Sequence, residues 1–172
     1  MERKTFIEFG KQKDNTIDYL IGILEDARVT TLRRVVNVTL EELHWQFKPG
    51  WNTIGVLLSH MIANEHFFRI MYLEGRELSK EESEQWTPGQ EMGKYIPQLI
   101  THEPLDNYFI QLQQSRALLL QGISPLTKED FWEKREGDYN LAWVLYHLAE
   151  DEVHHRGQIS ILRKLYALEN KT

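Results

Sequence analysis

Apolar residues recur at steps of three and four along four long segments of this 172-residue chain. This spacing is the period of an α-helix with one buried face, and strand-like alternation is scarce anywhere in the sequence. The predicted helices run from Asp14 to about Val36, from Asn52 or Thr53 to about Leu73, from near Pro104 to Ile123, and from Asn140 to about Leu168. The sequence therefore predicts an all-α fold.

The segments between these helices carry capping and turn signals. Thr39 and Glu42 form a capping-box pattern, and Thr127 to Asp130 repeats a weaker one. The polar stretch from Glu74 to Gln90 contains two glycines and a proline, so we expect a long connection that continues to Glu103 and overlies one end of the helices. Four long helices with one long crossover are typical of a four-helix bundle, and the length fits a single domain spanning residues 1–172.

The composition limits the classes of function. A formal net charge of -6 provides no basic footprint for nucleic acid. No apolar run approaches the roughly 20 residues of a membrane helix, and the first residues do not resemble a signal peptide, so we expect a cytoplasmic protein without membrane contact. The chain has no cysteine. Disulfides and thiol nucleophiles are therefore excluded, and His, Asp and Glu remain as candidate metal ligands.

Two polar residues interrupt the apolar stripe of the fourth predicted helix. At about 100° per residue, the following positions stay within a narrow arc. They are Leu141, Val144, Leu148, Asp151, His155, Ile159 and Leu162. A buried carboxylate is costly without a partner, so Asp151 requires a cation nearby. His155 lies four residues further on, a spacing at which one helix can chelate a metal ion with two side chains.

A third ligand would have to come from another helix, and His60 in the middle of the second helix is the candidate. It flanks the stripe of Leu57, Met61 and Asn64, at a depth comparable to that of the pair in the fourth helix. Two histidines and one carboxylate leave coordination positions open for water or substrate, and such a set suits zinc, nickel, iron or manganese. The more ordinary interpretation is a buried Asp–His ion pair or hydrogen-bonded core histidines, and the residues alone leave both open.

Other polar residues near these stripes are weaker candidates. His147 and His154 flank the seam of the fourth helix, and His147 could reach the mouth of a site there. Glu65 is a possible proton acceptor, although a partly exposed charge is the simpler interpretation. Glu152 and Arg156 are expected to form a solvated ion pair between residues four apart.

Two strings of residues resemble a known family. One is Asp151-Glu152-Val153-His154-His155-Arg156-Gly157-Gln158-Ile159, and the other runs from Gly50-Trp51-Asn52-Thr53-Ile54 through Leu57-Leu58-Ser59-His60 to Glu65. Both resemble the DinB/YfiT-like family, and the resemblance covers nearly the whole chain. That family has a four-helix bundle with a metal bound by one residue of the second helix and two residues four apart on the fourth. These positions fall on His60, Asp151 and His155.

The resemblance also implies an activity. The chain departs from the commonest family pattern at Asp151, where histidine is usual, but the related mycothiol-dependent maleylpyruvate isomerases carry a carboxylate at the equivalent place. The resemblance implies a homodimeric, metal-dependent S-transferase that adds a low-molecular-weight thiol, such as bacillithiol or mycothiol, to an electrophile. The alternatives are metal-dependent hydrolysis, with Glu65 or His147 moving protons, and a non-catalytic metal-binding stress-response protein.

Overall fold

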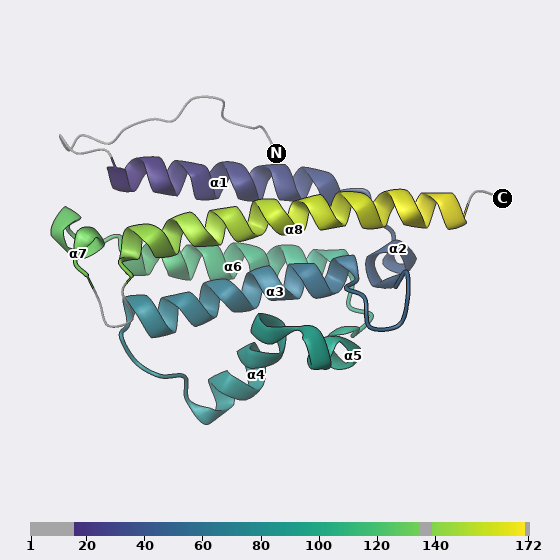
Figure 1. The fold of residues 1–172 in the computed structure, drawn as a ribbon, viewed down its shortest axis with the longest axis horizontal. Coiled ribbons are helices and arrows are strands. Elements are labelled where there is room, and N and C mark those ends of the chain that lie inside the picture. Colours follow the sequence, from purple (N-terminus) through teal and green to yellow (C-terminus); the bar gives the residue numbers. More distant parts are fainter. Residues whose placement is uncertain (1–15, 135–138, 171–172) are drawn as a thin grey trace.

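Four long helices lie side by side in the computed structural model, which describes residues 16–134 and 139–170 (Figure 1). They are α1 (Thr16–Val35), α3 (Ile54–Phe68, continued by the π-helical η1, Arg69–Leu73), α6 (Leu105–Ile123) and α8 (Leu141–Glu169). The described residues contain no β-strand, which confirms the predicted all-α fold. The predicted start of the first helix at Asp14 lies outside the described residues. No helix in the described ranges is long and apolar enough to cross a membrane.

The capping residues predicted from the sequence start the helices. The Thr53 hydroxyl accepts from the backbone N–H of the third residue of α3, and the Asn140 side chain does the same for α8. Thr39 and Thr127 begin two short helices, α2 (Leu40–His44) and α7 (Lys128–Trp132). Only the second of these two has a complete capping box, because the Glu42 carboxylate accepts from Arg163 instead.

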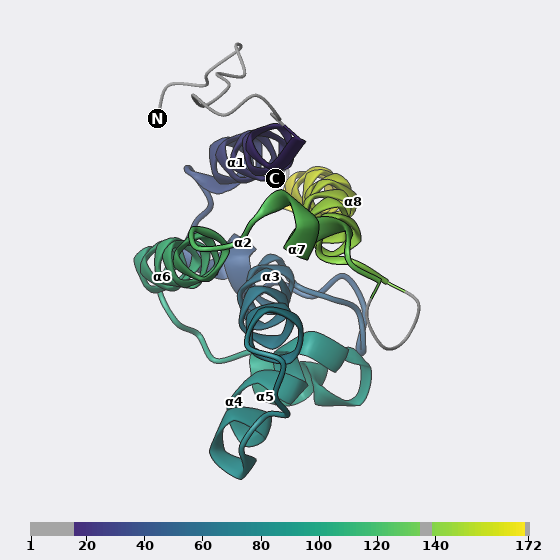
Figure 2. The ribbon, with the colours of Figure 1, turned by 90° about the vertical axis from the view of Figure 1, so that its left-hand side faces the viewer.

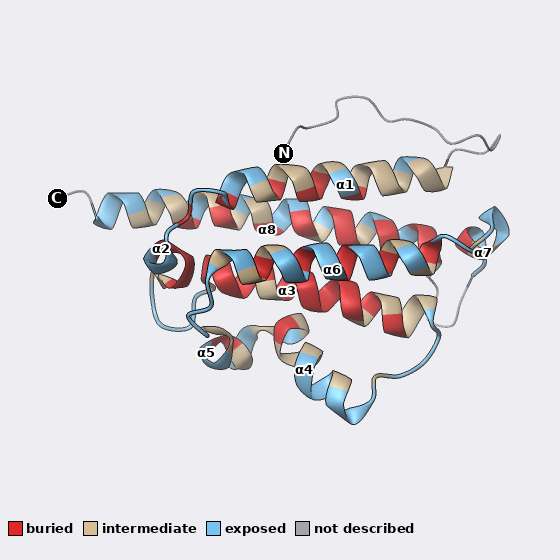
Figure 3. Ribbon diagram, turned by 180° about the vertical axis from the view of Figure 1, so that it is seen from behind, coloured by how far each residue is buried: buried red, intermediate tan, exposed pale blue. Residues whose placement is uncertain are grey.

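The connection between α3 and α6 travels back along the bundle, because these two helices run in the same direction (Figures 1 and 3). Where the sequence predicted a loop, this segment forms α4 (Lys80–Glu91), η2 (Gly93–Tyr95) and α5 (Ile96–Leu99). The end-on view shows α4 and α5 against the side of α3 that faces away from α1 (Figure 2). The segment therefore covers a flank of α3 and is not a loop over one end of the bundle.

Local contacts explain why α4 forms and where it docks. Ser79 and Glu82 make a reciprocal capping box at its start. Trp86 stacks on His66 of α3, with ring centroids 3.9 Å apart. At Gly89 the two helices approach so closely that an added Cβ would lie 2.7 Å from the Cβ of Ala63. A glycine is therefore required at this contact, and its carbonyl is brought next to α3.

The core consists of two apolar clusters with a polar layer between them. One cluster contains Leu43, Leu57, Leu58, Leu112, Ile159 and Leu162 among others. The other contains Leu24, Leu119, Leu141, Val144, Leu145 and Leu148 among others. In the layer between them, each long helix contributes one charged side chain that is between 3% and 7% exposed: Arg28, Glu65, Arg116 and Glu152.

These four side chains form a closed ring of ion pairs. Arg28 donates to Glu152 at 2.9 Å and to Glu65 at 3.0 Å. Arg116 donates to Glu65 at 2.6 Å and to Glu152 at 3.2 Å. Two predictions were therefore wrong, because Glu65 is fully buried and Glu152 does not pair with Arg156, whose guanidinium donates to α1 instead. Both carboxylates are buried because each has two guanidinium partners, which local spacing along one helix does not reveal.

Candidate metal centre

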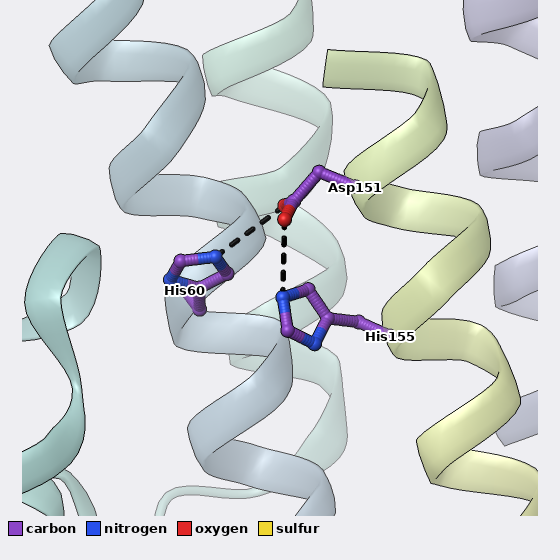
Figure 4. A group of neighbouring side chains, drawn as sticks. All are labelled: His60, Asp151 and His155. Atoms are coloured by element: carbon purple, nitrogen blue, oxygen red, sulfur yellow. Dashed lines mark ion pairs between the residues drawn. The ribbon is translucent and has the colours of Figure 1, made fainter. Parts of the chain in front are cut away.

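His60, Asp151 and His155 meet between α3 and α8, near the middle of the bundle (Figure 4). The Asp151 carboxylate lies 3.4 Å from the Nε2 atom of His60 through one oxygen and 3.2 Å from that of His155 through the other. One ligand atom from each residue lies within 4.8 Å of the other two. Donors bound to one tetrahedral zinc-like ion are about 3.3 Å apart, so modest closure around an ion is sufficient.

Carbonyl oxygens orient both imidazole rings. The Nδ1 atom of His60 lies 2.9 Å from the backbone oxygen of Gly89, which can only accept, so Nδ1–H is the donor. Nε2, the ring nitrogen nearer Asp151, is then the atom that would coordinate an ion. The Nδ1 atom of His155 lies 3.4 Å from the side-chain oxygen of Gln158, which favours the same tautomer. Metal-binding histidines in proteins are commonly held in this way, with the second nitrogen donating to an oxygen.

The side chain of Asn64 lies at the same point, and the sequence analysis did not single it out. Its Nδ2 atom is 2.8 Å from Nε2 of His60 and 3.1 Å from a carboxylate oxygen of Asp151. Asn64 is only 5% exposed, and its Oδ1 atom has no hydrogen-bond partner among the described residues. Rotation of the amide by 180° would exchange its two ends and turn an oxygen donor toward the centre.

The Asp151 carboxylate is held in its charged form. Burial by itself would raise the pKa of Asp151, but hydrogen bonds from His155 and His60 and the charges of both rings lower it well below its usual value. An ionised carboxylate and two imidazole lone pairs form a donor set that a divalent cation can occupy. After the 180° rotation of its amide, the unpartnered oxygen of Asn64 would add a further oxygen donor. The residues present therefore fit a metal ion.

The weaker candidates are not brought into this group. Burial raises the pKa of Glu65. The charges of Arg28 and Arg116 and the hydrogen bond from Ser115 lower it by a larger amount, so the net pKa is below normal. A carboxylate held in this way is a poor proton acceptor. His147 stacks on Trp143 with a centroid distance of 4.8 Å. The exposed ring of His154 lies against the Gln158 side chain, with 2.8 Å between the His154 Nε2 and Gln158 Nε2 atoms.

Comparison with known proteins identifies one family. A family model described as mycothiol-S-transferase matches residues 19–167, a range that includes His60, Asp151 and His155. This match agrees with the resemblance to the DinB-like proteins that the sequence strings indicated. No curated protein matches the chain significantly.

Proposed function

This chain belongs to the mycothiol-S-transferase family, and from that premise we propose that it is a metal-dependent transferase joining a low-molecular-weight thiol to an electrophile. The observation that carries the proposal is the convergence of His60, Asp151 and His155, with both imidazole Nε2 atoms and the carboxylate facing one point. A chain without cysteine has to take the nucleophilic sulfur from a co-substrate.

His60, Asp151 and His155 would hold a divalent ion such as zinc, nickel, iron or manganese. When bound, the ion lowers the pKa of a coordinated thiol and holds the thiolate, which is the nucleophilic form. Two neutral imidazoles and one carboxylate would leave a single positive charge on a divalent ion held by these residues. One thiolate would balance that charge, so the donor set suits a thiol co-substrate.

The transfer itself exchanges one bond for another. The thiol releases its proton to solvent, and a sulfur lone pair forms a C–S bond with the electrophilic carbon. The leaving group departs with the electron pair of the bond that breaks. The protein supplies position, because Gly89 and Gln158 fix the rings and the low exposure of His60 and His155, 7% and 5%, restricts water at the reacting atoms.

Hydrolysis is less well supported than thiol transfer. It would need a proton acceptor beside the attacking water. Glu65 is held by Arg28, Arg116 and Ser115, and His147 is stacked on an aromatic ring. Neither of the two residues considered for this role is therefore placed to accept the proton.

Metal content and thiol dependence test the proposal together. Protein purified without an affinity tag should contain about one divalent ion per chain, and His60→Ala should lose it. His154→Ala is the matched control, because this exposed histidine adjoins His155 but lies outside the triad, and it should keep the ion.

The loaded protein is then mixed with 1-chloro-2,4-dinitrobenzene in the presence or absence of mycothiol or bacillithiol. Consumption that requires a thiol and is lost in His60→Ala supports the transferase. Turnover without thiol would indicate a hydrolase, and tight metal binding without turnover a non-catalytic protein. Failure of the wild type to bind zinc, nickel, iron or manganese would contradict all three functions.

A further inference from the structure

A cavity of about 470 Å³ lies beside the candidate metal centre. It is enclosed by the loop before α3, the end of α4 with η2 and α5, and the second half of α8. Five apolar side chains make up most of its lining: Trp51, Met92, Ile96, Ile161 and Leu162. Cavities of this size with mainly apolar walls and a few polar groups are typical of sites for small organic molecules.

The cavity continues the face of α8 that carries the candidate ligands. Asp151, His155, Gln158 and Leu162 follow one another at steps of four, three and four residues, so they share one side of the helix. Gln158 connects the two regions directly, because its side-chain oxygen lies 3.4 Å from His155 Nδ1 while the same residue lines the cavity.

The end of α4 makes a second connection. The backbone oxygen of Gly89 accepts from His60, and Glu91 and Met92, two and three residues further on, line the cavity. The segments that orient both histidines therefore also form the cavity walls. Met92 adopts a φ of 52°, which is uncommon for a residue with a side chain, so the wall keeps a turn that costs conformational energy.

Two apolar side chains of the lining remain exposed. Trp51 is 47% exposed and Ile161 is 57% exposed, although both are large hydrophobic residues. An apolar ligand in the cavity would cover this surface and gain the free energy of its removal from water.

We propose that this cavity binds the apolar body of the electrophile, so that the enzyme selects hydrophobic organic electrophiles, aromatic ones above all. This inference rests on the proposed transferase function. Only Asn52, Glu91 and Gln158 bring polar side chains to the lining, and Glu91 carries a negative charge. A polar or anionic co-substrate would find few hydrogen-bond donors there, whereas an aromatic ring can pack against Trp51 and Ile161.

The first test compares two electrophiles that react with the same thiol. With metal-loaded protein and mycothiol, KM is measured for aromatic 1-chloro-2,4-dinitrobenzene and for iodoacetamide, which has no apolar body. Ile161→Ser should raise KM for the aromatic compound by roughly 3- to 10-fold while kcat, KM for iodoacetamide and KM for mycothiol stay unchanged. Val153→Ser is the control, because Val153 is also exposed on α8, at 45%, and does not line the cavity.

An equal effect of Ile161→Ser on both electrophiles, or on neither, would overturn the inference. A change in sedimentation caused by this substitution would assign the face to a second copy of the chain and would also overturn it. Neither result would affect the transferase proposal, which depends on thiol-dependent turnover by the wild type.

The second test separates binding from reaction. Equilibrium dialysis measures the affinity of 1,3-dinitrobenzene, which has no leaving group, for wild type, Ile161→Ser and Val153→Ser. Binding that is weakened only by Ile161→Ser supports the cavity as an apolar ligand site even if transferase activity is never found. Undetectable binding to the wild type would overturn the inference even if transfer is observed.

Discussion

At the candidate centre, the orientation of the His60 ring is determined before any ion arrives. Its Nδ1–H donates to the Gly89 oxygen, so Nε2 is the ring nitrogen that faces Asp151. The low pKa of Asp151, which hydrogen bonds from His155 and His60 produce against the effect of burial, keeps the carboxylate ionised. A cation entering the site does not have to displace a proton from this carboxylate. We therefore expect metal binding here to depend on the identity of single side chains.

Asp151 distinguishes a metal site from a simple buried ion pair. Asp151→Ala should sharply lower the metal content while the metal-free protein loses little stability, because the substitution also removes a buried charge. Asp151→His should keep or strengthen binding, since imidazole can coordinate the same ion. Metal stoichiometry and thermal midpoint of the three proteins are the measurements. Equal metal content in wild type and Asp151→Ala would show that this carboxylate is not a ligand.

Asn64 offers a second test at the same point. If its amide oxygen supports the ion, Asn64→Leu should weaken metal affinity by roughly 10-fold, as removal of groups around a metal site commonly does. The thermal midpoint of the metal-free protein reports separately on the loss of the two hydrogen bonds that Nδ2 makes to His60 and Asp151. Competition with a chromophoric chelator measures the affinity. The control is Asn107→Leu, at a half-buried residue of α6 outside the centre. Equal metal affinities of the Asn64→Leu and Asn107→Leu variants would exclude the role.

The sequence predicted the convergence at the centre because helical periodicity determines which residues share a face. The polar interruption of one apolar stripe selected Asp151 and His155, and His60 was selected because it flanks the stripe of the second helix at a comparable depth. Asn64 was missed although it follows His60 by four residues, the same spacing as in the Asp151–His155 pair. The arginine–glutamate ring was not predictable in this way. Its partners are separated by 36 to 124 residues, so no local spacing indicates the pairs.

At the scale of elements, α4 shows how tertiary contacts form a helix that hydrophobic periodicity does not indicate. Its sequence is polar and contains Pro88 and Gly89, which favoured a loop. A local signal was nevertheless present, since Ser79 and Glu82 have the spacing of a capping box. The docking of Trp86 on His66 and the close approach at Gly89 depend on α3, so they become visible only in the folded chain.

The contact at Gly89 holds α4 against α3, so a displacement of α4 should lower the metal affinity. In Gly89→Ala the new methyl group would lie 2.7 Å from the Ala63 Cβ and 3.0 Å from the Ser59 oxygen, so α4 has to move. We expect a loss of roughly 1 to 3 kcal/mol in the free energy of unfolding, and weaker metal binding because His60 loses its acceptor. Urea unfolding and metal titration measure the two effects.

Gly157→Ala is the matched control on α8. A Cβ at Gly157 meets nothing within 4 Å, and the residue lies inside a helix. This substitution should stabilise the protein by roughly 0.5 to 1 kcal/mol through helix propensity. If the two alanine variants have equal unfolding free energies and equal metal affinities, the close packing of α4 against α3 does not contribute to stability or metal binding.

At the scale of the whole molecule, the ring of Arg28, Glu65, Arg116 and Glu152 joins all four long helices. Its two positive and two negative charges cancel. Because all four side chains are buried, each charge depends on its neighbours in the ring for compensation. Such rings contribute less to net stability than apolar packing of the same volume, whereas removal of one member leaves an uncompensated buried charge. We therefore expect their contribution to appear mainly when one charge is removed, by substitution or by acid.

Acid unfolding tests this expectation at Glu65. Burial raises its pKa, but Arg28, Arg116 and Ser115 lower it to a net value below the ordinary 4.5. As pH falls below 4.5, the unfolded chain binds the proton first, so this contribution to stability is present above pH 4.5 and is lost as pH falls through the lowered folded value.

Urea unfolding between pH 7 and pH 3 should show this loss in wild type. Glu65→Gln should be less stable by roughly 3 to 5 kcal/mol at pH 7 but lose less on acidification. Glu81→Gln, at an exposed residue of α4, should follow the wild type. A wild-type profile parallel to that of Glu65→Gln would contradict the depressed pKa.

Assembly is the remaining prediction at this scale. From the family resemblance we expect a homodimer, so sedimentation at micromolar concentration should give a species of twice 20.5 kDa. A species of 20.5 kDa would contradict this expectation.

Neighbouring residues of α3 and α8 serve different partners. Asn64 and Asp151 turn toward the histidines, while Glu65 and Glu152, the next residue in each helix, turn toward the arginines. Consecutive residues of a helix point about 100° apart. A slip of one residue, with its accompanying rotation, would offer each arginine or histidine the wrong side chain. Only one alignment of α3 against α8 satisfies both groups at once, so the polar middle of the bundle excludes shifted packings that the leucines at either side would tolerate.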